Sequence, residues 1–376
     1  MMSVIPLSLY IHMPWCVQKC PYCDFNSHNI KQTPPYEAYI EHLLADLRHD
    51  LPLSLGRAIH SIFIGGGTPS LFSSELIAHL LTTIRSYIDF EDNAEITLEA
   101  NPNSADASYF VGYLDAGINR ISIGVQSFQA DKLVQLGRVH NPNDAIKAAQ
   151  LAQSLPLRSF NLDLMHGLPT QSLADALSDL SQAVALSPPH LSWYQLTIEP
   201  NTLFGSKPPK LPDEDALWDI YQQGHQLLTT NGYEQYETSA YAKAGFQCQH
   251  NLNYWRFGDY LGIGCGAHGK LTQPDGRIMR TIKTRHPKGY MTGRYLEKSY
   301  IVPQDELPFE FFMNQFRLFE AAPKARFEQR TQLPIQTVER PIEQAIQKGY
   351  ITEDNHYWYL TPHGKLFLNS LLELFL

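Results

Sequence analysis

The chain has 376 residues, of which 43% are hydrophobic and 18% charged, and its formal net charge is −9. This composition predicts a globular protein large enough for one α/β barrel with a smaller appendage, and it argues against bulk nucleic-acid binding, which needs a cationic surface to neutralise phosphates. No stretch reaches the roughly 20 apolar residues of a membrane span.

The amino-terminal segment and the cysteines indicate a cytoplasmic protein. The chain runs directly into the apolar run "VIPLSLYIHM", with no basic segment or cleavage site of a signal peptide. Five cysteines are an odd number, and three of them lie within eight residues, so a disulfide framework is not expected. A reducing compartment and a metal or cluster site fit this usage better.

Short apolar runs alternate with amphipathic stretches over the first 200 residues. Strands are expected at 7–13, 61–66, 94–100, 120–125, 159–165 and 190–198. Helices are expected at 36–51, 73–88, 104–117, 143–154 and 172–186. One helix between successive strands indicates βα units around a parallel sheet. The expected fold class is therefore α/β, a partial (β/α)6 TIM-like barrel, with an open doubly wound sheet as the alternative.

The pattern changes after residue 199. A Pro-, Gly- and Lys-containing loop (199–215) precedes an expected helix (214–231) and a Gly- and aromatic-rich stretch (245–269). Residues 306–321 look helical, and residues 349–376 predict a strand, a tight turn, a strand and a closing helix. We therefore expect a barrel over 1–200, a barrel extension over 201–300, and a small α+β winged-helix-like domain over 301–376, which packs rather than binds nucleic acid.

Chemically distinctive residues follow each expected strand of the barrel. They are Cys16, Cys20 and Cys23; Gly65, Gly66, Gly67, Thr68 and Pro69; Glu99; Gln126; Asp163; and Thr197 with Glu199. The carboxyl ends of barrel strands form the active site in such folds, so one shared rim is expected. The glycine run lets the backbone approach a ligand closely, and it lacks the lysine of a phosphate-binding P-loop.

The three clustered cysteines leave the fourth position of a metal site open. A structural zinc site needs four protein ligands, and His12 or His28 could supply the fourth. No second cysteine pair lies downstream, because Cys248 and Cys265 are widely spaced. A 4Fe–4S cluster held by three thiolates would instead leave one iron free for a small molecule.

The spacing CxxxCxxC, with Tyr22 before the last cysteine, resembles the radical SAM superfamily. The GGGTP stretch is similar to that family's motif for the amino group of S-adenosylmethionine (SAM), and it follows the expected strand. The resemblance implies a 4Fe–4S cluster bound by Cys16, Cys20 and Cys23. It also implies that the open iron chelates the amino and carboxylate groups of SAM.

A closer resemblance covers nearly the whole chain. "YIHMPWC", "FIGGGTPS", "ITLEANP", "ISIGVQSF", "LGRVHN", "NLDLMHGLP" and "YLGIGCGAHG" are similar to the oxygen-independent coproporphyrinogen dehydrogenase branch. This likeness implies a SAM pocket. Its residues would be Tyr10, Tyr22, Gly66, Gly67, Thr68, Glu99, Gln126, Arg138 and Asp163. For Asp163 and Arg138, a buried structural acid and a surface ion pair are the alternatives.

Two departures separate the chain from the dehydrogenase. Phe25 stands where that enzyme has a fourth cysteine, and only residues 1–6 precede the first expected strand, where the enzyme has a sizeable extension. Both departures make decarboxylation of coproporphyrinogen unexpected. Both resemble the heme-chaperone relatives of that enzyme.

The segment "HNLNYW" (250–255) resembles the heme motif HNxxYW of those relatives. Histidine is a usual axial ligand of heme iron, so His250 is the candidate ligand. Tyr254 and Trp255 offer flat faces for a macrocycle. Cys248 and His268 are alternative ligands, and a buried core histidine is the structural alternative.

The resemblance therefore implies a heme chaperone that binds a 4Fe–4S cluster, SAM and heme, and no catalytic residue is assigned. Expected partners are respiratory heme apoproteins at the membrane and bacterioferritin as a heme source, and SAM-linked dimerisation is compatible with the surface. The protein is expected in the cytoplasm or peripherally at the inner membrane. The alternatives are coproporphyrinogen III dehydrogenase, another radical SAM enzyme that uses a second SAM, and a zinc-stabilised binding protein.

Overall fold

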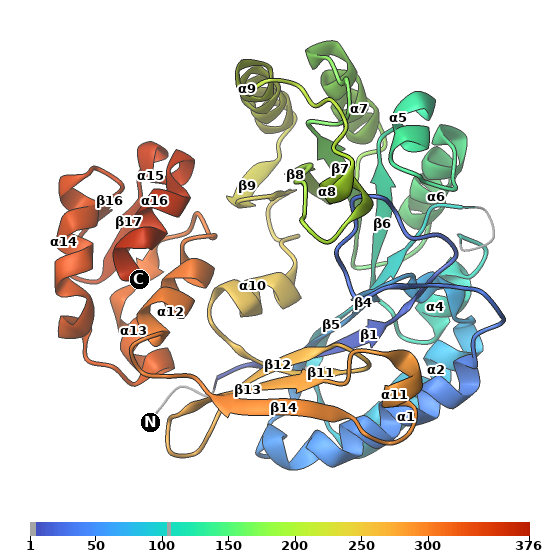
Figure 1. The fold of residues 1–376 in the computed structure, drawn as a ribbon, viewed down its shortest axis with the longest axis horizontal. Coiled ribbons are helices and arrows are strands. Elements are labelled where there is room, and N and C mark those ends of the chain that lie inside the picture. Colours follow the sequence, from blue (N-terminus) through green and yellow to red (C-terminus); the bar gives the residue numbers. More distant parts are fainter. Residues whose placement is uncertain (1–4, 104–106) are drawn as a thin grey trace.

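The computed structural model describes residues 5–103 and 107–376, and its centre is one 12-stranded mixed sheet (Figure 1). The strands lie in the order β14 (Leu296–Ile301), β13 (Ile278–Lys283), β12 (His268–Thr272), β11 (Asp259–Ile263), β1 (Leu7–Met13), β4 (Ile59–Gly66), β5 (Phe90–Ala100), β6 (Arg120–Gln126), β7 (Ser159–His166), β8 (His190–Gln195), β10 (Ala240–Ala242) and β9 (Glu234–Glu237). Strands β11, β1 and β4 to β8 run parallel, and the others are antiparallel. The sheet curves but does not close, since β14 and β9 are its edges.

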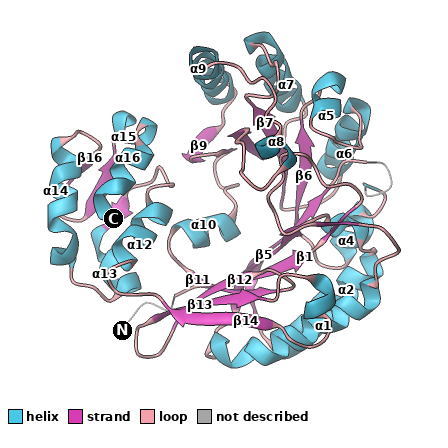
Figure 2. Cartoon of the chain, viewed as in Figure 1, coloured by secondary structure: helices cyan, strands magenta, loops and turns pink. Residues whose placement is uncertain are grey.

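Helices cover the outer face of the curved sheet (Figure 2). They are α1 (Tyr36–Asp50), α2 (Ser74–Tyr87), α4 (Phe110–Asp115), α5 (Ala130–Gln135), α6 (Pro142–Ser154), α7 (Leu173–Ala185) and α9 (Glu214–Thr230). Asn141 and Ser172 start α6 and α7 with capping boxes that satisfy the first free amides. The predicted partial (β/α)6 barrel is confirmed over β1 and β4 to β8.

Several expected element bounds need correction, and the helix expected at 306–321 ends at Gln315. Strand β8 ends at Gln195 rather than 198, and Phe90 begins β5 earlier than expected. Part of the helix expected at 104–117 lies outside the described residues, and α4 accounts for 110–115. The short helix α5 was missed because its two buried positions are too few to show a helical period.

The two faces of the sheet differ in chemistry. On β1, Leu7, Leu9, Ile11 and Met13 belong to the main hydrophobic core against the helices. The alternate side chains, such as Ser8, point to the concave inner face, because successive side chains of a strand alternate between faces. On β4 to β7, alternate isoleucine and leucine side chains belong to the same core. The sheet therefore buries an apolar outer face and keeps an inner face of polar groups.

The sequence did not predict the strands between residues 230 and 301. Strand β11 pairs in parallel with β1, and β12, β13 and β14 continue the sheet antiparallel beyond it. The glycines in "YLGIGCGAHG" hid these strands, since Gly262 and Gly269 serve close backbone approach rather than turns. The short helices α8 (Leu203–Ser206) and α11 (Pro287–Tyr290) lie in connections.

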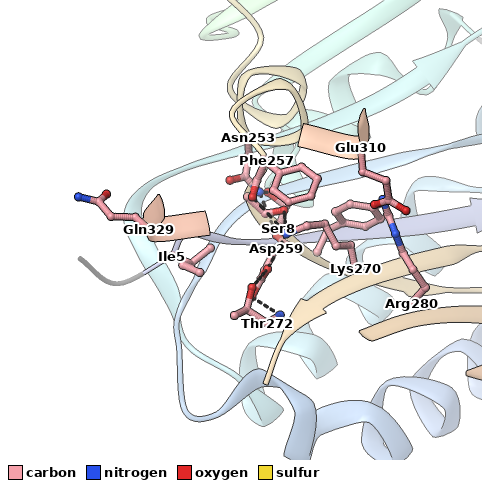
Figure 3. A network of polar contacts seen from close by, with 12 residues as sticks. Ile5, Ser8, Asn253, Phe257, Asp259, Lys270, Thr272, Arg280, Glu310 and Gln329 are labelled. Carbon is pink, nitrogen blue, oxygen red and sulfur yellow. Dashed lines mark hydrogen bonds and ion pairs between the residues drawn. The ribbon is translucent and has the colours of Figure 1, made fainter. Parts of the chain in front are cut away.

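The helix α10 (Gln249–Trp255) packs under the amino ends of the strands, against β1, β4 and β11. Figure 3 shows the buried polar network that holds its carboxyl end. Asn253 donates from Nδ2 to Ser8 Oγ at 2.8 Å and to the Asp259 carbonyl at 2.9 Å. The Lys270 ammonium pairs with Asp259 Oδ1 at 3.1 Å. Both charges are almost fully buried, so removing one partner would be strongly unfavourable.

The last 70 residues form a separate small core. Helices α12 (Leu307–Gln315), α13 (Lys324–Thr331), α14 (Glu339–Gln347), α15 (Pro362–Leu366) and α16 (Leu368–Leu372) surround a three-stranded antiparallel sheet of β15 (Ala322–Pro323), β17 (Tyr357–Leu360) and β16 (Ile351–Glu353). Phe312, Phe327 and Trp358 are in its centre. The expected strand, turn, strand and helix after residue 349 are confirmed. Within residues 5–103 and 107–376, no helix is both long and apolar enough to cross a bilayer.

Candidate functional site

A pocket of ≈ 410 Å³ lies at the carboxyl ends of the parallel strands. Its wall includes Cys16, Cys20, Tyr22, Cys23, Gly66, Gly67, Thr68, Glu99, Gln126, Arg138 and Asp163. Each of the strands β4 to β8 contributes residues to the wall of this pocket, as expected if the carboxyl ends of the strands share one rim. The structure thus brings together every predicted site residue except Tyr10 and His250.

The three cysteines lie on a loop that backbone bonds hold against the barrel. The two-residue strands β2 (Trp15–Cys16) and β3 (His28–Asn29) pair in parallel. The Cys23 amide donates to the Cys20 carbonyl at 3.1 Å. Lys19 Nζ donates to the Phe25 carbonyl at 2.9 Å, which closes the loop on itself. The loop therefore presents all three thiols to the pocket.

The donor set fits an iron–sulfur cluster better than a single ion. Among the described residues, no three His, Cys, Asp or Glu side chains converge on one point where a metal ion could be held. A cluster does not need such a point, because each thiolate holds a different iron. Of the two candidate fourth zinc ligands, His12 already bonds Tyr10 through Nδ1 at 3.0 Å and the Asn26 carbonyl through Nε2 at 2.8 Å. The Nε2 of His28, the other candidate, has no hydrogen-bond partner in the described chain.

Glycines are required where strand β4 meets the pocket. Gly66 has a φ of +111°, and a Cβ there would lie 2.4 Å from the His12 ring. At Gly67, a Cβ would lie 2.7 Å from the Trp15 carbonyl oxygen. The amides of Gly67 and Thr68 bond the backbone of the β1 and cysteine segments. The GGGTP stretch is thus joined tightly to the cysteine loop.

Two partly buried carboxyl groups face the pocket from β5 and β7. Glu99 accepts from the Gly66 amide at 3.0 Å, and burial together with the charge of Asp163 raises the pKa of Glu99 to about 7. Asp163 accepts from Ser122 at 3.0 Å and from Asn161 at 2.8 Å. Burial also raises the pKa of Asp163. These acids can accept hydroxyl or ammonium donors from a ligand that reaches them.

Arg138 places a cation beside the cysteine loop. Its guanidinium donates to Asn101 Oδ1 at 2.8 Å and to the Gly124 carbonyl at 2.7 Å, and it lies 3.6 Å from Cys20 Sγ. Gln126 accepts a hydrogen bond from the Tyr194 hydroxyl at 2.9 Å. The φ of Gln126 is +67°, an uncommon backbone conformation of the kind that concentrates at ligand sites.

Three of these pocket residues were missed at the sequence level. Asn101 and Tyr194 lie within quoted stretches, "ITLEANP" and "HLSWYQLTI", but they were given no role. Ser122 was also unassigned. The alternation of β6 and β8 could have found Ser122 and Tyr194, because inward residues recur every second position.

Tyr10 and the heme-motif histidine lie elsewhere. Tyr10 is half-buried on β1, and its ring stacks on Phe63 at 6.5 Å. His250 lies on α10, at the opposite end of the barrel from the cysteines, and is 1% exposed. Its Nδ1 bonds Ser61 Oγ at 3.0 Å, and its backbone amide donates to Glu95 Oε1 at 3.2 Å.

The environment of His250 keeps its imidazole neutral. Burial lowers the pKa of His250 to about 3, and within the described chain its Nε2 has no hydrogen-bond partner. Tyr254 packs edge-on against the ring at 4.6 Å. Cys248 is also buried, and burial raises the pKa of this thiol to about 12, so it is not a ready thiolate. His268 is exposed at the start of β12.

Comparison with known proteins decides the family. The model of the Radical SAM superfamily matches residues 10–182, and that of the HemN C-terminal domain matches residues 302–367. The heme chaperone HemW of Escherichia coli (strain K12) is 64% identical over 376 residues, which is 100% of both chains. The chain belongs to the HemW family.

Other HemW proteins and one solved structure extend this comparison. HemW of Haemophilus influenzae is 65% identical over 99% of this chain and 98% of its own. HemW of Bacillus subtilis is 32% identical over 98% and 99%. The structure of coproporphyrinogen III oxidase (HemN) from E. coli has a TM-score of 0.84 and covers 99% of this chain and 90% of its own. Its identity of 22% shows a shared fold alone.

Proposed function

We propose that this HemW family member is a heme chaperone that carries a 4Fe–4S cluster and SAM in the barrel pocket, binds heme, and delivers it to respiratory heme proteins at the membrane. Full-length identity of 64% to a HemW protein carries this proposal. The pocket geometry supports it, because three thiols, a glycine edge and two partly buried acids share one cavity.

The pocket residues divide into two groups by their chemistry. Cys16, Cys20 and Cys23 would hold the cluster, which supplies an open iron able to chelate a small molecule. Glu99 and Asp163 would accept hydrogen bonds from the ribose hydroxyls or ammonium group of SAM, and Arg138 would face its carboxylate. Gly66, Gly67 and Thr68 would offer backbone groups at close range, beside Tyr22 and Gln126. Tyr10 does not line the pocket and would act indirectly, through its hydrogen bond to His12.

Heme would bind at α10 through His250. The neutral imidazole and its unpartnered Nε2 favour ligation, while burial opposes it. A heme can reach this nitrogen only if α10 moves away from the strands. The binding-competent state is then a minor one, and the apparent affinity falls by its population. Cys248 and His268 are the alternative ligands.

We also propose where the chain acts, its heme source, its oligomeric state and the roles of its three regions. The chain would act in the cytoplasm and at the inner-membrane surface, receive heme from bacterioferritin, and form a SAM-linked dimer. Residues 1–200 would hold the cluster and SAM, residues 201–300 the heme segment, and residues 301–376 a winged-helix-like packing domain.

The experiment that tests this function is heme transfer. The cluster would be rebuilt anaerobically, hemin added, and the complex isolated by gel filtration before mixing with an apocytochrome. We expect stoichiometric retained heme that moves to the acceptor. A chain that retains no hemin, or that never gives it up, would contradict the proposal.

The ligand assignment has its own test. His250→Ala should weaken heme binding and leave iron and sulfide content unchanged, because α10 and the cysteines lie at opposite ends of the barrel. An unchanged hemin titration would move the ligand elsewhere, and Cys248→Ala would be measured next.

A further inference from the structure

A second cleft, of ≈ 480 Å³, lies beside the pocket and outside the barrel. Its walls come from the ends of β7 and β8, from α9, from the β9–β10 turn and from the carboxyl-terminal domain. Tyr194 and Gln195 line both this cleft and the cysteine pocket, so the two spaces are neighbours across β8. Its volume is in the range of small-molecule sites.

Flat aromatic rings dominate one wall of the cleft. Trp193 and Tyr221 lie nearly parallel, with ring centres 6.5 Å apart and planes at 5°. Trp218 stacks on the other side of this group, 5.9 Å from Tyr221 at 29°. Such faces favour a flat conjugated ligand, since offset stacking adds stabilisation beyond area burial. Trp218 is 42% exposed, so a ligand can reach it.

An imidazole with an unpartnered nitrogen lines the cleft beside Trp193. His166 is 4% exposed, its ring centre is 4.3 Å from that of Trp193, and its Nδ1 has no hydrogen-bond partner in the described chain. Buried polar atoms without partners are rare in folded proteins and call for an explanation. Burial lowers the pKa of His166 to about 4, so the ring is neutral, the form in which imidazole binds metals.

The rim adds a cation and an exposed apolar edge. The Lys365 ammonium lies 4.1 Å from the centre of the Phe319 ring, and Leu366 beside it is 52% exposed. Glu214 is the acidic residue of the lining. The cleft thus combines a flat apolar wall and a buried metal-binding nitrogen with a basic group at one side.

We propose that this cleft is a second porphyrin site, in which a heme stacks on Trp218, places a propionate at Lys365 and takes His166 as its iron ligand. This inference rests on the proposed function but not on α10. The cleft is already open and has His166 in its lining, whereas His250 lines neither this cleft nor the cysteine pocket. Heme would therefore enter here before the buried α10 site opens.

Two porphyrins separate stacking from iron ligation in the test. Hemin and metal-free protoporphyrin would be titrated into the full chain, with absorbance and tryptophan fluorescence as readouts. We expect His166→Ala to weaken hemin binding roughly tenfold, or about 1.4 kcal/mol, and to leave metal-free protoporphyrin unchanged. Trp218→Ala should weaken both porphyrins roughly three- to tenfold, and Trp218→Phe should restore most of the loss.

Matched controls use exposed residues outside the cleft. His356→Ala and Lys348→Glu should leave both titrations unchanged, while Lys365→Glu should weaken both porphyrins. Identical hemin binding in wild type, His166→Ala and Trp218→Ala would overturn the cleft and leave the chaperone function standing. Wild-type chain that binds no hemin would instead overturn the proposed function. His250→Ala that retains the His166-dependent hemin would support the cleft as a separate site.

Discussion

The same strands form both ends of the barrel, but the carboxyl end is open and the amino end is closed. At the carboxyl ends, Glu99 and Asp163 line an open pocket with the three thiols. At the amino ends, α10 closes the opening, and Glu95 and Ser61 both bond His250 or its backbone. The difference teaches that a recognisable motif can describe either an accessible site or a closed one.

Buried hydrogen bonds span the distance between these two ends. Asp163 accepts from Asn161 at 2.8 Å, and Asn161 bonds His190 at 2.7 Å. His190 bonds the Tyr236 hydroxyl at 2.9 Å, and the Cys248 amide donates to that hydroxyl at 3.3 Å. The inner face of the sheet is therefore a hydrogen-bonded polar scaffold that connects the two ends of the barrel.

Removing one thiol should have the largest effect on the open end. Cys20→Ala is expected to abolish cluster assembly, because two thiolates do not hold the cube, while Cys265→Ala, a buried cysteine outside the pocket, should retain it. Iron, sulfide and visible absorbance after anaerobic reconstitution measure this. A cluster of normal content in Cys20→Ala would show that the ligands are wrongly assigned.

Adding a methyl group at Gly66 should have the second-largest effect. Gly66→Ala places its Cβ against the His12 ring at a φ of +111°, so we expect a loss of about 2–4 kcal/mol from combined strain and overpacking, with weaker SAM binding. Gly117→Ala is the matched control, because its φ is +103° but no described atom lies within 4 Å of the added Cβ. Thermal unfolding of both variants, with and without SAM, makes the comparison. Equal losses would mean that contact with His12 is not the cause.

The partly buried Glu99 at the open end should make stability depend on pH. The pKa of Glu99 is raised to about 7 in the folded chain, so its contribution is present below about pH 4.5 and is lost as pH rises through 7. The loss should be on the order of 3 kcal/mol. Glu99→Gln should flatten the fall in melting temperature between pH 5.5 and 8 in the cofactor-free chain. The exposed Glu37→Gln should not, and a parallel fall in all three proteins would refute the role of Glu99.

Loosening the closed end should have the smallest cost in stability. Asn253→Ala removes the bonds to Ser8 and to the Asp259 carbonyl, so we expect a loss of about 1–3 kcal/mol. If heme reaches His250 only when α10 moves, this variant should bind hemin faster than wild type. Stopped-flow absorbance in a His166→Ala background isolates this site, and a slower or unchanged rate would argue against an α10 gate.

Much of the fold was predictable because the barrel strands are short apolar runs between capped helices. Strand β1 and the glycine edge were located correctly for this reason. The rim residues followed from one geometric rule, that parallel strands end together. The sequence could not show the depth of burial. His250 lies in a motif and Cys248 two residues before it, but whether α10 closes the barrel depends on distant partners such as Ser61 and Glu95. The cleft at His166 was also not predictable, because its walls come from five separated parts of the chain.

The measurement that tests the central claim most directly compares two porphyrin substrates on the anaerobically reconstituted chain. One sample receives hemin, and the other receives coproporphyrinogen III with SAM and a reductant. The chaperone account predicts stoichiometric retained heme and no protoporphyrinogen, with Phe25 at the pocket mouth in place of a fourth cysteine. Oxidised product in the second sample would contradict it and make the chain a dehydrogenase.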